Sequence, residues 1–192
     1  MTTSRTARTL LTAVLAVAAL VSAGCGNKHD ITTEAETEGI WVDVGPLDYH
    51  VQGSRVLEAG LLPDRSYLVG LPNGTAEPAG DEVWFAIFMR IENKTDEAVP
   101  TAREFEIHDT EGKTFTPYGL DPESNPFAYE AMELDPNRVV PVEDSAQEFN
   151  SFSGAELLFK LPLDSYQNRP LELVIRSGGG EGPEEARISL DV

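Results

Sequence analysis

The feature that most constrains the fold of this chain is a series of short apolar segments separated by turn-forming residues. Seven segments rich in aromatic and β-branched residues predict strands at 47–57, 82–92, 104–109, 138–142, 155–161, 171–176 and 186–192. Turn-forming residues lie between them, and the chain contains 13 Pro and 16 Gly. After residue 40, no stretch keeps a helical apolar period for three turns. The pattern predicts an all-β fold, an antiparallel β-sandwich of two sheets, over residues 40–192.

The segment 82–92 predicts a strand that is apolar on both faces. If its odd-numbered apolar residues face the core, Trp84 and Phe88 face the other way. Two outward-facing aromatic residues would form a partner-binding patch, so Trp84 and Phe88 are candidate partner-facing residues. The alternative is that one of the long Gly- and Pro-rich segments, 58–81 or 118–137, covers them. Both segments contain apolar residues that need cover, which favours this alternative.

The first 24 residues differ from the rest of the chain. They carry Arg5 and Arg8, no acidic residue, an apolar run over 10–21, and small residues just before Cys25. This arrangement is typical of a secretory signal peptide. The apolar run is shorter than the about 20 residues that a membrane-spanning helix needs. We therefore predict that residues 1–24 are a cleaved signal peptide.

The residues VSAGC at 21–25 resemble the lipobox of bacterial lipoproteins. The resemblance implies that the thiol of Cys25 carries a diacylglyceryl group and that cleavage leaves Cys25 as the first residue. Ser22 departs from the family pattern, which more often has Leu there. Cys25 is the only cysteine, and an exported protein has little use for one unpaired thiol. We predict lipid attachment at Cys25, and two acyl chains suffice for stable anchoring to the outer face of the cell membrane. The alternative is a secreted protein with an incidental cysteine.

Residues 25–39 are acidic and contain one large apolar residue, Ile31. Such a composition predicts a flexible, solvated tether with a reach of roughly 20 Å. The predicted organisation is therefore a signal peptide over 1–24, a lipidated cysteine and tether over 25–39, and a sandwich domain over 40–192.

A resemblance to a known family lies in the segment 82–115, where the apolar strand runs into Asn93-Lys94-Thr95 and a later strand ends in an acidic residue, Gly112 and an aromatic. The segment GAELLFKLP at 154–162 extends it. Together they resemble an uncharacterised immunoglobulin-like domain family of bacterial lipoproteins, related to the mycobacterial immunoprotective secreted antigen. The resemblance implies an immunoglobulin-like β-sandwich outside the membrane and no known catalytic residues.

The charge balance and the motif content exclude or disfavour several functions. With 14 Lys and Arg against 33 Asp and Glu, the net charge is −19, which argues against nucleic-acid binding. His29, His50 and His108 lie in unrelated contexts and no catalytic motif is present, so we do not expect an enzyme. The acidic turns at 121–125 and 135–137 lack the ligand spacing of a calcium loop, so neither a metal nor a cofactor is expected.

These observations predict a membrane-anchored, extracytoplasmic lipoprotein whose immunoglobulin-like domain acts as a binding or scaffolding module. Its partners would be the membrane, through the anchor on Cys25, and an envelope protein. The alternative is a carrier of a small ligand or a metal ion in the cell envelope.

Overall fold

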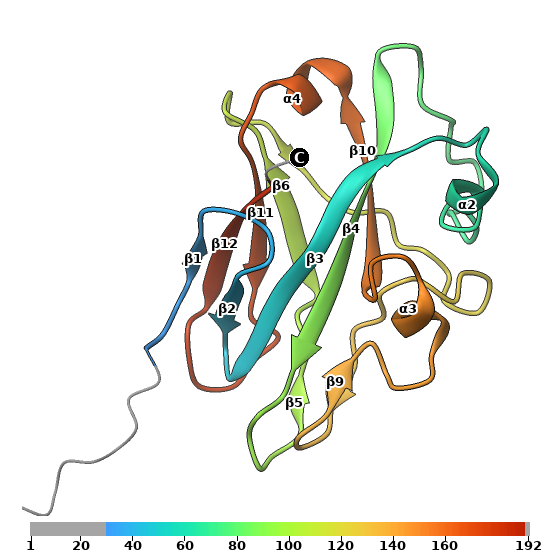
Figure 1. Ribbon diagram of the computed structural model, residues 1–192. Coiled ribbons are helices and arrows are strands. Elements are labelled where there is room, and N and C mark those ends of the chain that lie inside the picture. Colours follow the sequence, from blue (N-terminus) through green and yellow to red (C-terminus); the bar gives the residue numbers. More distant parts are fainter. Residues whose placement is uncertain (1–29, 191–192) are drawn as a thin grey trace, which may run out of the picture. The chain divides into compact units, whose positions relative to one another are not determined.

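The computed structural model describes residues 30–190 (Figure 1). The first sheet has five strands, in the order β1 (Glu34–Ala35), β12 (Glu185–Leu190), β11 (Leu171–Arg176), β6 (Glu104–His108) and β7 (Thr114–Phe115). The second has the order β10 (Ala155–Pro162), β4 (Glu82–Glu92), β3 (Leu47–Leu57) and β2 (Trp41–Val44), with β9 (Val139–Val140) also paired to β4. A small third sheet pairs β5 (Val99–Pro100) with β8 (Glu133–Leu134). The short helices are α2 (Leu62–Arg65), α3 (Ala146–Phe149) and α4 (Leu163–Gln167).

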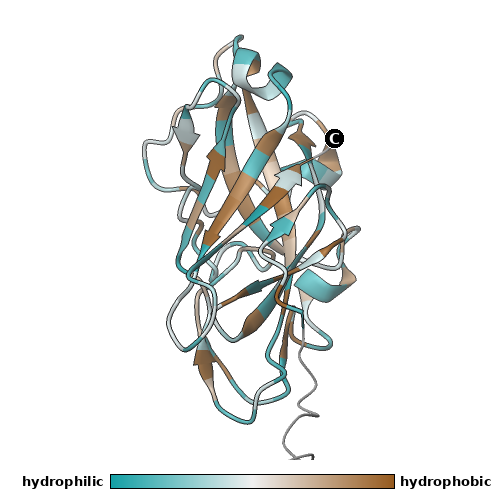
Figure 2. Ribbon diagram, turned by 90° about the vertical axis from the view of Figure 1, so that its left-hand side faces the viewer, coloured by the Kyte–Doolittle hydropathy of each residue, from teal (hydrophilic) through white to brown (hydrophobic). Residues whose placement is uncertain are grey.

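This architecture confirms the predicted two-sheet β-sandwich, whose strand pairs are antiparallel except for β1 with β12. Strands β3, β4 and β11 have the predicted bounds. Apolar residues alternate along strands such as β6 and β12, so that one face of the sheet meets the other sheet (Figure 2). The core joins residues such as Phe85, Ile87, Leu173 and Ile188, all fully buried. Burial of this alternating apolar face is what selects the sandwich.

The predicted tether over 25–39 is wrong for its second half. Strand β1 pairs with β12, and Ala35 is buried. The Thr32 N–H donates to Asp43 Oδ2, and the Asp43 N–H donates to the Thr32 carbonyl, each at 2.7 Å. A strand pairs through its backbone N–H and C=O groups, which are present whatever its side chains are. An acidic composition therefore does not prevent a segment from pairing at a sheet edge. The folded domain therefore begins near residue 32 rather than at residue 40.

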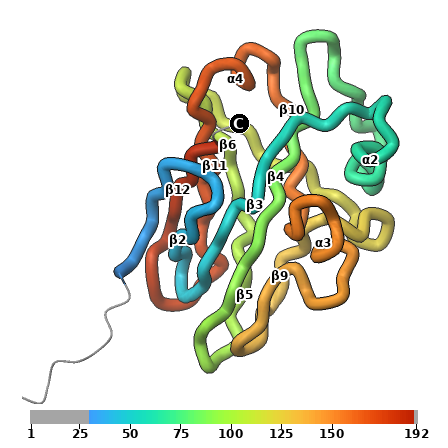
Figure 3. The backbone as a smooth tube through the Cα atoms, viewed as in Figure 1, coloured from blue at the N-terminus to red at the C-terminus, as the bar shows by residue number. Residues whose placement is uncertain are grey.

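A second apolar layer lies on the outer face of the β10–β4–β3–β2 sheet. In Figure 3, α2 and the yellow chain segment that follows β7 lie beside the sheet that contains β10, β4 and β3. The buried members of the layer are Leu57, Tyr67, Trp84, Ala86, Phe88 and Leu158, packed by Leu68, Leu71, Tyr118, Leu120, Phe127 and Phe152. The two long segments thus cover the sheet instead of extending into solvent.

One glycine makes this layer possible. A Cβ at Gly53, placed at an irregularity in the pairing of β3 with β4, would lie 2.7 Å from the Phe152 ring. Because that space is open, Phe152 stacks on Phe88 with ring centroids 4.6 Å apart and an interplanar angle of 5°.

The predicted signal peptide and Cys25 lie outside the described residues, so both stay predictions. Within residues 30–190, none of the helices has the length and apolarity needed to cross a bilayer.

Candidate binding cavity at the edge of β10

Trp84 and Phe88 face away from the main core, as predicted, but they are buried. Their exposed fractions are 2% and 0%. Trp84 meets Tyr118 edge to face at 5.3 Å, and Phe88 lies between Phe152 and Tyr67. The prediction that they form a partner-facing patch is wrong, and the alternative of cover by the long segments is confirmed. Burying two large aromatic residues removes a large apolar area from water, which is why the segments fold back.

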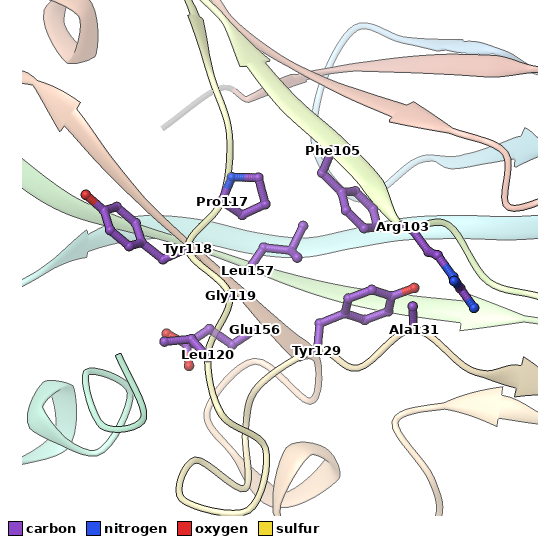
Figure 4. A pocket seen from close by; sticks show the side chains of 10 residues that line it. All are labelled: Arg103, Phe105, Pro117, Tyr118, Gly119, Leu120, Tyr129, Ala131, Glu156 and Leu157. Atoms are coloured by element: carbon purple, nitrogen blue, oxygen red, sulfur yellow. The ribbon is translucent and has the colours of Figure 1, made fainter. Parts of the chain in front are cut away.

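A surface cavity of about 250 Å³ opens where the same segments pass the edge of β10. Figure 4 shows its lining, with Leu157 between two groups of side chains. One group comprises Arg103, Phe105, Tyr129 and Ala131; the other comprises Pro117, Tyr118, Gly119, Leu120 and Glu156. The lining is mostly aromatic and aliphatic, with one cation and one carboxyl group. That composition is typical of small-molecule sites, although this cavity is slightly smaller than their usual volume of about 300–1,000 Å³.

Backbone hydrogen bonds to β10 hold both walls of the cavity. The Tyr118 N–H donates to the Leu158 carbonyl, and the Tyr129 N–H donates to the Glu156 carbonyl, each at 2.8 Å. The first segment runs antiparallel to β10 and the second runs parallel to it. The edge of β10 is therefore satisfied by two loops, and the gap between these loops forms the mouth of the cavity.

The Tyr129 side chain is fixed in the wall. Its hydroxyl donates to the Ala102 carbonyl at 2.6 Å and lies 2.8 Å from Thr101 Oγ1. The ring meets Phe105 edge to face at 5.2 Å. Burial raises the pKa of Tyr129 to about 12, so the hydroxyl stays protonated at neutral pH. This wall is preformed, which lowers the entropy cost of binding.

Glu156 is the one acidic residue of the lining, and it is 1% exposed. Its Oε2 accepts a hydrogen bond from Asn125 Nδ2 at 3.2 Å. Its Oε1 is buried and has no hydrogen-bond partner among the described residues. Asn125 is itself fully buried, and its amide also donates to the Tyr67 carbonyl at 3.0 Å. A buried carboxyl group with one unpaired oxygen is costly to the fold, which makes it a candidate functional group.

Burial raises the pKa of Glu156 to about 8, because desolvation outweighs the hydrogen bond from Asn125 and the charge of Arg55. The Arg55 guanidinium is ion-paired with Asp64, whose other carboxylate oxygen accepts the Glu58 N–H at 2.8 Å. The charge of Arg55 is thus balanced by a different acid, Asp64. Glu156 is mostly uncharged at neutral pH.

Arg103 lies exposed on the opposite side of the cavity from Glu156 (Figure 4). Among residues 30–190 it forms no hydrogen bond or ion pair, whereas Arg176 and Arg187 lie in ion pairs with neighbouring glutamates. A second hollow, of about 340 Å³, shares Arg103, Phe105 and Pro117 with the first. The guanidinium is therefore available to a ligand in either space.

The other sequence candidates do not come together. His29 lies outside the described residues. His50 is on β3, with its ring centroid 4.7 Å from that of Trp41 and the two rings tilted by 32°, while His108 is on β6 and is hydrogen-bonded to Glu106. Asp121 accepts hydrogen bonds from its own turn, at the Glu123 N–H and the Ser124 hydroxyl. The described part of the chain contains no group of three His, Cys, Asp or Glu residues placed to hold a metal ion.

The sequence reasoning missed this cavity. The segment 155–161 predicted a strand, but Glu156 was not recognised as a residue of its covered face. A signal was present, since Glu156 and Lys160 are the only polar residues in the otherwise apolar segment 155–161. Arg103 and Tyr129 had no signal, because they belong to irregular segments.

Fold and cavity together define a β-sandwich protein with a small, aromatic-walled cavity. Among solved structures, the chain is similar to the yjhA protein from Bacillus subtilis, with a TM-score of 0.52 at 14% identity, over 81% of this chain and 99% of that one. It is also similar to a "putative lipoprotein (ycdA)" from Bacillus subtilis, with a TM-score of 0.47 at 9% identity, over 79% and 38%. An uncharacterized beta-sandwich protein from Clostridium difficile 630 gives a TM-score of 0.43 at 10% identity, over 86% and 99%. At these identities the likeness concerns the fold alone. No protein-family model and no curated protein match the sequence.

Proposed function

We propose that this protein is a lipid-anchored lipoprotein of the cell envelope whose β-sandwich binds a small ligand outside the membrane. The observation that carries the binding half is the cavity at the edge of β10, with its aromatic walls and its buried, partly unpaired Glu156. The action proposed is binding rather than catalysis.

The structure bears differently on the functions suggested by the sequence, which are docking of an envelope protein and carriage of a small ligand or a metal ion. Docking of an envelope protein rested on Trp84 and Phe88, which are buried. The cavity supports carriage of a small ligand. Carriage of a metal ion has no such support, since residues 30–190 contain no group of three His, Cys, Asp or Glu side chains placed to hold a metal ion. The small-ligand function is therefore the one that the geometry supports best.

The anchoring half rests on the sequence, in which Cys25 follows a basic start, an apolar run and small residues. With the fold beginning near Thr32, about six residues separate the lipidated cysteine from the first hydrogen-bonded residue. Fully extended, a segment of that length spans at most about 20 Å, whereas the fifteen residues 25–39 would span about 50 Å. The domain would then be held closer to the lipid surface than a tether ending at residue 39 allows.

Anchoring is tested by fractionating cells that produce the protein or its Cys25→Ala variant. We expect the protein in the membrane fraction and the variant outside it, because the variant has no site for the acyl chains. Ser22→Ala, which keeps a small residue before the cleavage point, is the matched control and should stay with the membrane. Equal membrane retention of the protein and Cys25→Ala would refute the anchor.

Binding is tested with phenylacetamide, a neutral aromatic probe of about ten non-hydrogen atoms that suits a cavity of this size. Saturation-transfer NMR should detect it on the protein. Ala131→Phe, which fills the cavity from a half-buried wall position, should remove the signal. Ala98→Phe places the same ring on an exposed residue outside the cavity and should keep the signal. No signal on the protein, or a signal that survives Ala131→Phe, would contradict binding in the cavity.

A further inference from the structure

We infer that the ligand of the cavity is a small apolar carboxylate, with its aromatic or branched aliphatic body between the aromatic walls and its carboxylate on the guanidinium of Arg103. This inference rests on the proposed binding function and names the ligand class for the same site.

The apolar body of the ligand follows from the walls. Phe105 and Leu157 belong to the buried core and form the floor on one side, while Tyr118 and Leu120 close the other side. Hydrogen bonds from Tyr118 and Tyr129 to β10 keep these walls apart in the absence of any ligand. A flat ring or a branched chain enters such a slot with aromatic contacts on both sides.

The charge of the ligand follows from Arg103. Arg103 is exposed and has no ion pair among the described residues, so its charge is free to balance that of a ligand. Arg103 lines both hollows, so its guanidinium borders the space that a ligand occupies. A planar guanidinium matches a carboxylate with two parallel hydrogen bonds. One free cation balances one negative charge, which favours a monocarboxylate over a multiply charged phosphate.

Glu156 does not oppose this assignment. It lies across the cavity from Arg103 (Figure 4), and at neutral pH burial keeps it mostly uncharged. A carboxylate ligand therefore meets an uncharged wall on that side. An ionised acid in the same place would repel the ligand.

The test compares phenylacetate with phenylacetamide, which has the same shape and no charge, on the full-length protein. We expect phenylacetate to bind about fivefold more tightly, as one charge-assisted contact at an exposed rim supplies. Arg103→Gln should remove this preference and leave phenylacetamide binding unchanged. Arg138→Gln is the matched control, since Arg138 is another exposed arginine and lies outside the cavity lining; it should keep the preference.

Equal binding of the two probes to the protein would overturn the inference, and so would a preference that survives Arg103→Gln. Tighter binding of phenethylamine, the cation of similar size, would overturn it in favour of a cationic ligand. Each of these results leaves the proposed binding function standing. If neither phenylacetate nor phenylacetamide binds, both the inference and the binding function fail. Because the Arg103 side chain makes no hydrogen bond within the described residues, its replacement should leave the melting temperature unchanged, which verifies that the variant folds.

Discussion

Replacing Glu156 by glutamine should stabilise the protein, and more so at higher pH. Burial raises the pKa of the Glu156 carboxyl from 4.5 to about 8 in the folded chain. Between these two values the folded chain holds one more proton than the unfolded chain. The free energy of unfolding therefore falls by about 1.4 kcal/mol for each pH unit.

The stability of the protein changes with pH in the opposite direction to that expected for an ion-paired carboxylate, which stabilises a fold more as pH rises. Ionisation of Glu156 adds no cost below pH 4.5, where the carboxyl group is protonated in both the folded and the unfolded state. The cost grows as pH rises and levels off above about pH 8, at about 4–5 kcal/mol in total; at pH 7 it is about 3 kcal/mol. Glutamine has no such cost, because it is neutral at every pH and its carbonyl still accepts the hydrogen bond from Asn125.

The assay is chemical denaturation of the protein and of Glu156→Gln at pH 5, 7 and 9. The two should be nearly equal in stability at pH 5, and Glu156→Gln should be more stable by about 3 kcal/mol at pH 7 and by about 4–5 kcal/mol at pH 9. Glu123→Gln, on an exposed turn, is the matched control for removal of one negative charge. A difference between the protein and Glu156→Gln that is the same at all three pH values would refute the reasoning.

Three further predictions concern buried side chains of the sandwich. Trp84→Ala combined with Phe88→Ala should lower the free energy of unfolding by more than about 5 kcal/mol, since both rings are buried; a melting temperature like that of the unmodified protein would contradict their burial. Asn93→Ala should cost about 2–3 kcal/mol in a denaturation curve, because the buried amide donates to three backbone carbonyls at 2.8–3.1 Å. Tyr49→Phe should cost about 1–3 kcal/mol by the same measurement, because the Ala102 N–H loses its buried acceptor at 2.7 Å; unchanged stability would exclude that hydrogen bond.

Strands such as β6 and β12 were predictable because their apolar residues alternate, and β4 because its apolar run is rich in aromatic and β-branched residues. The period of two along 82–92 assigned each residue of β4 to the correct face, with Trp84 and Phe88 opposite the main core. Alternation does not indicate whether the outward face of a sheet is exposed to solvent or covered by another segment. That depends on where the 58–81 and 118–137 segments return, and their packing rests on scattered residues such as Tyr67.

The cavity was not predictable because it is made by backbone pairing at an edge. The hydrogen bonds of Tyr118 and Tyr129 to β10 use N–H groups that every residue except proline has, so they leave no mark in the sequence. Likewise, the pairing of Glu34–Ala35 with β12 was hidden by an acidic composition typical of a linker. In both places the local sequence looked irregular, and the partner strand supplied the order.

The entry of the chain into the fold also has a mechanical consequence. Thr32 exchanges hydrogen bonds with Asp43 in the second sheet, and the next residue, Thr33, accepts the Arg187 N–H in the first sheet at 2.8 Å. A force applied at the amino end is therefore divided between the two sheets within two residues of chain. Under a steady pull, contacts to both sheets must rupture before the sandwich begins to unravel.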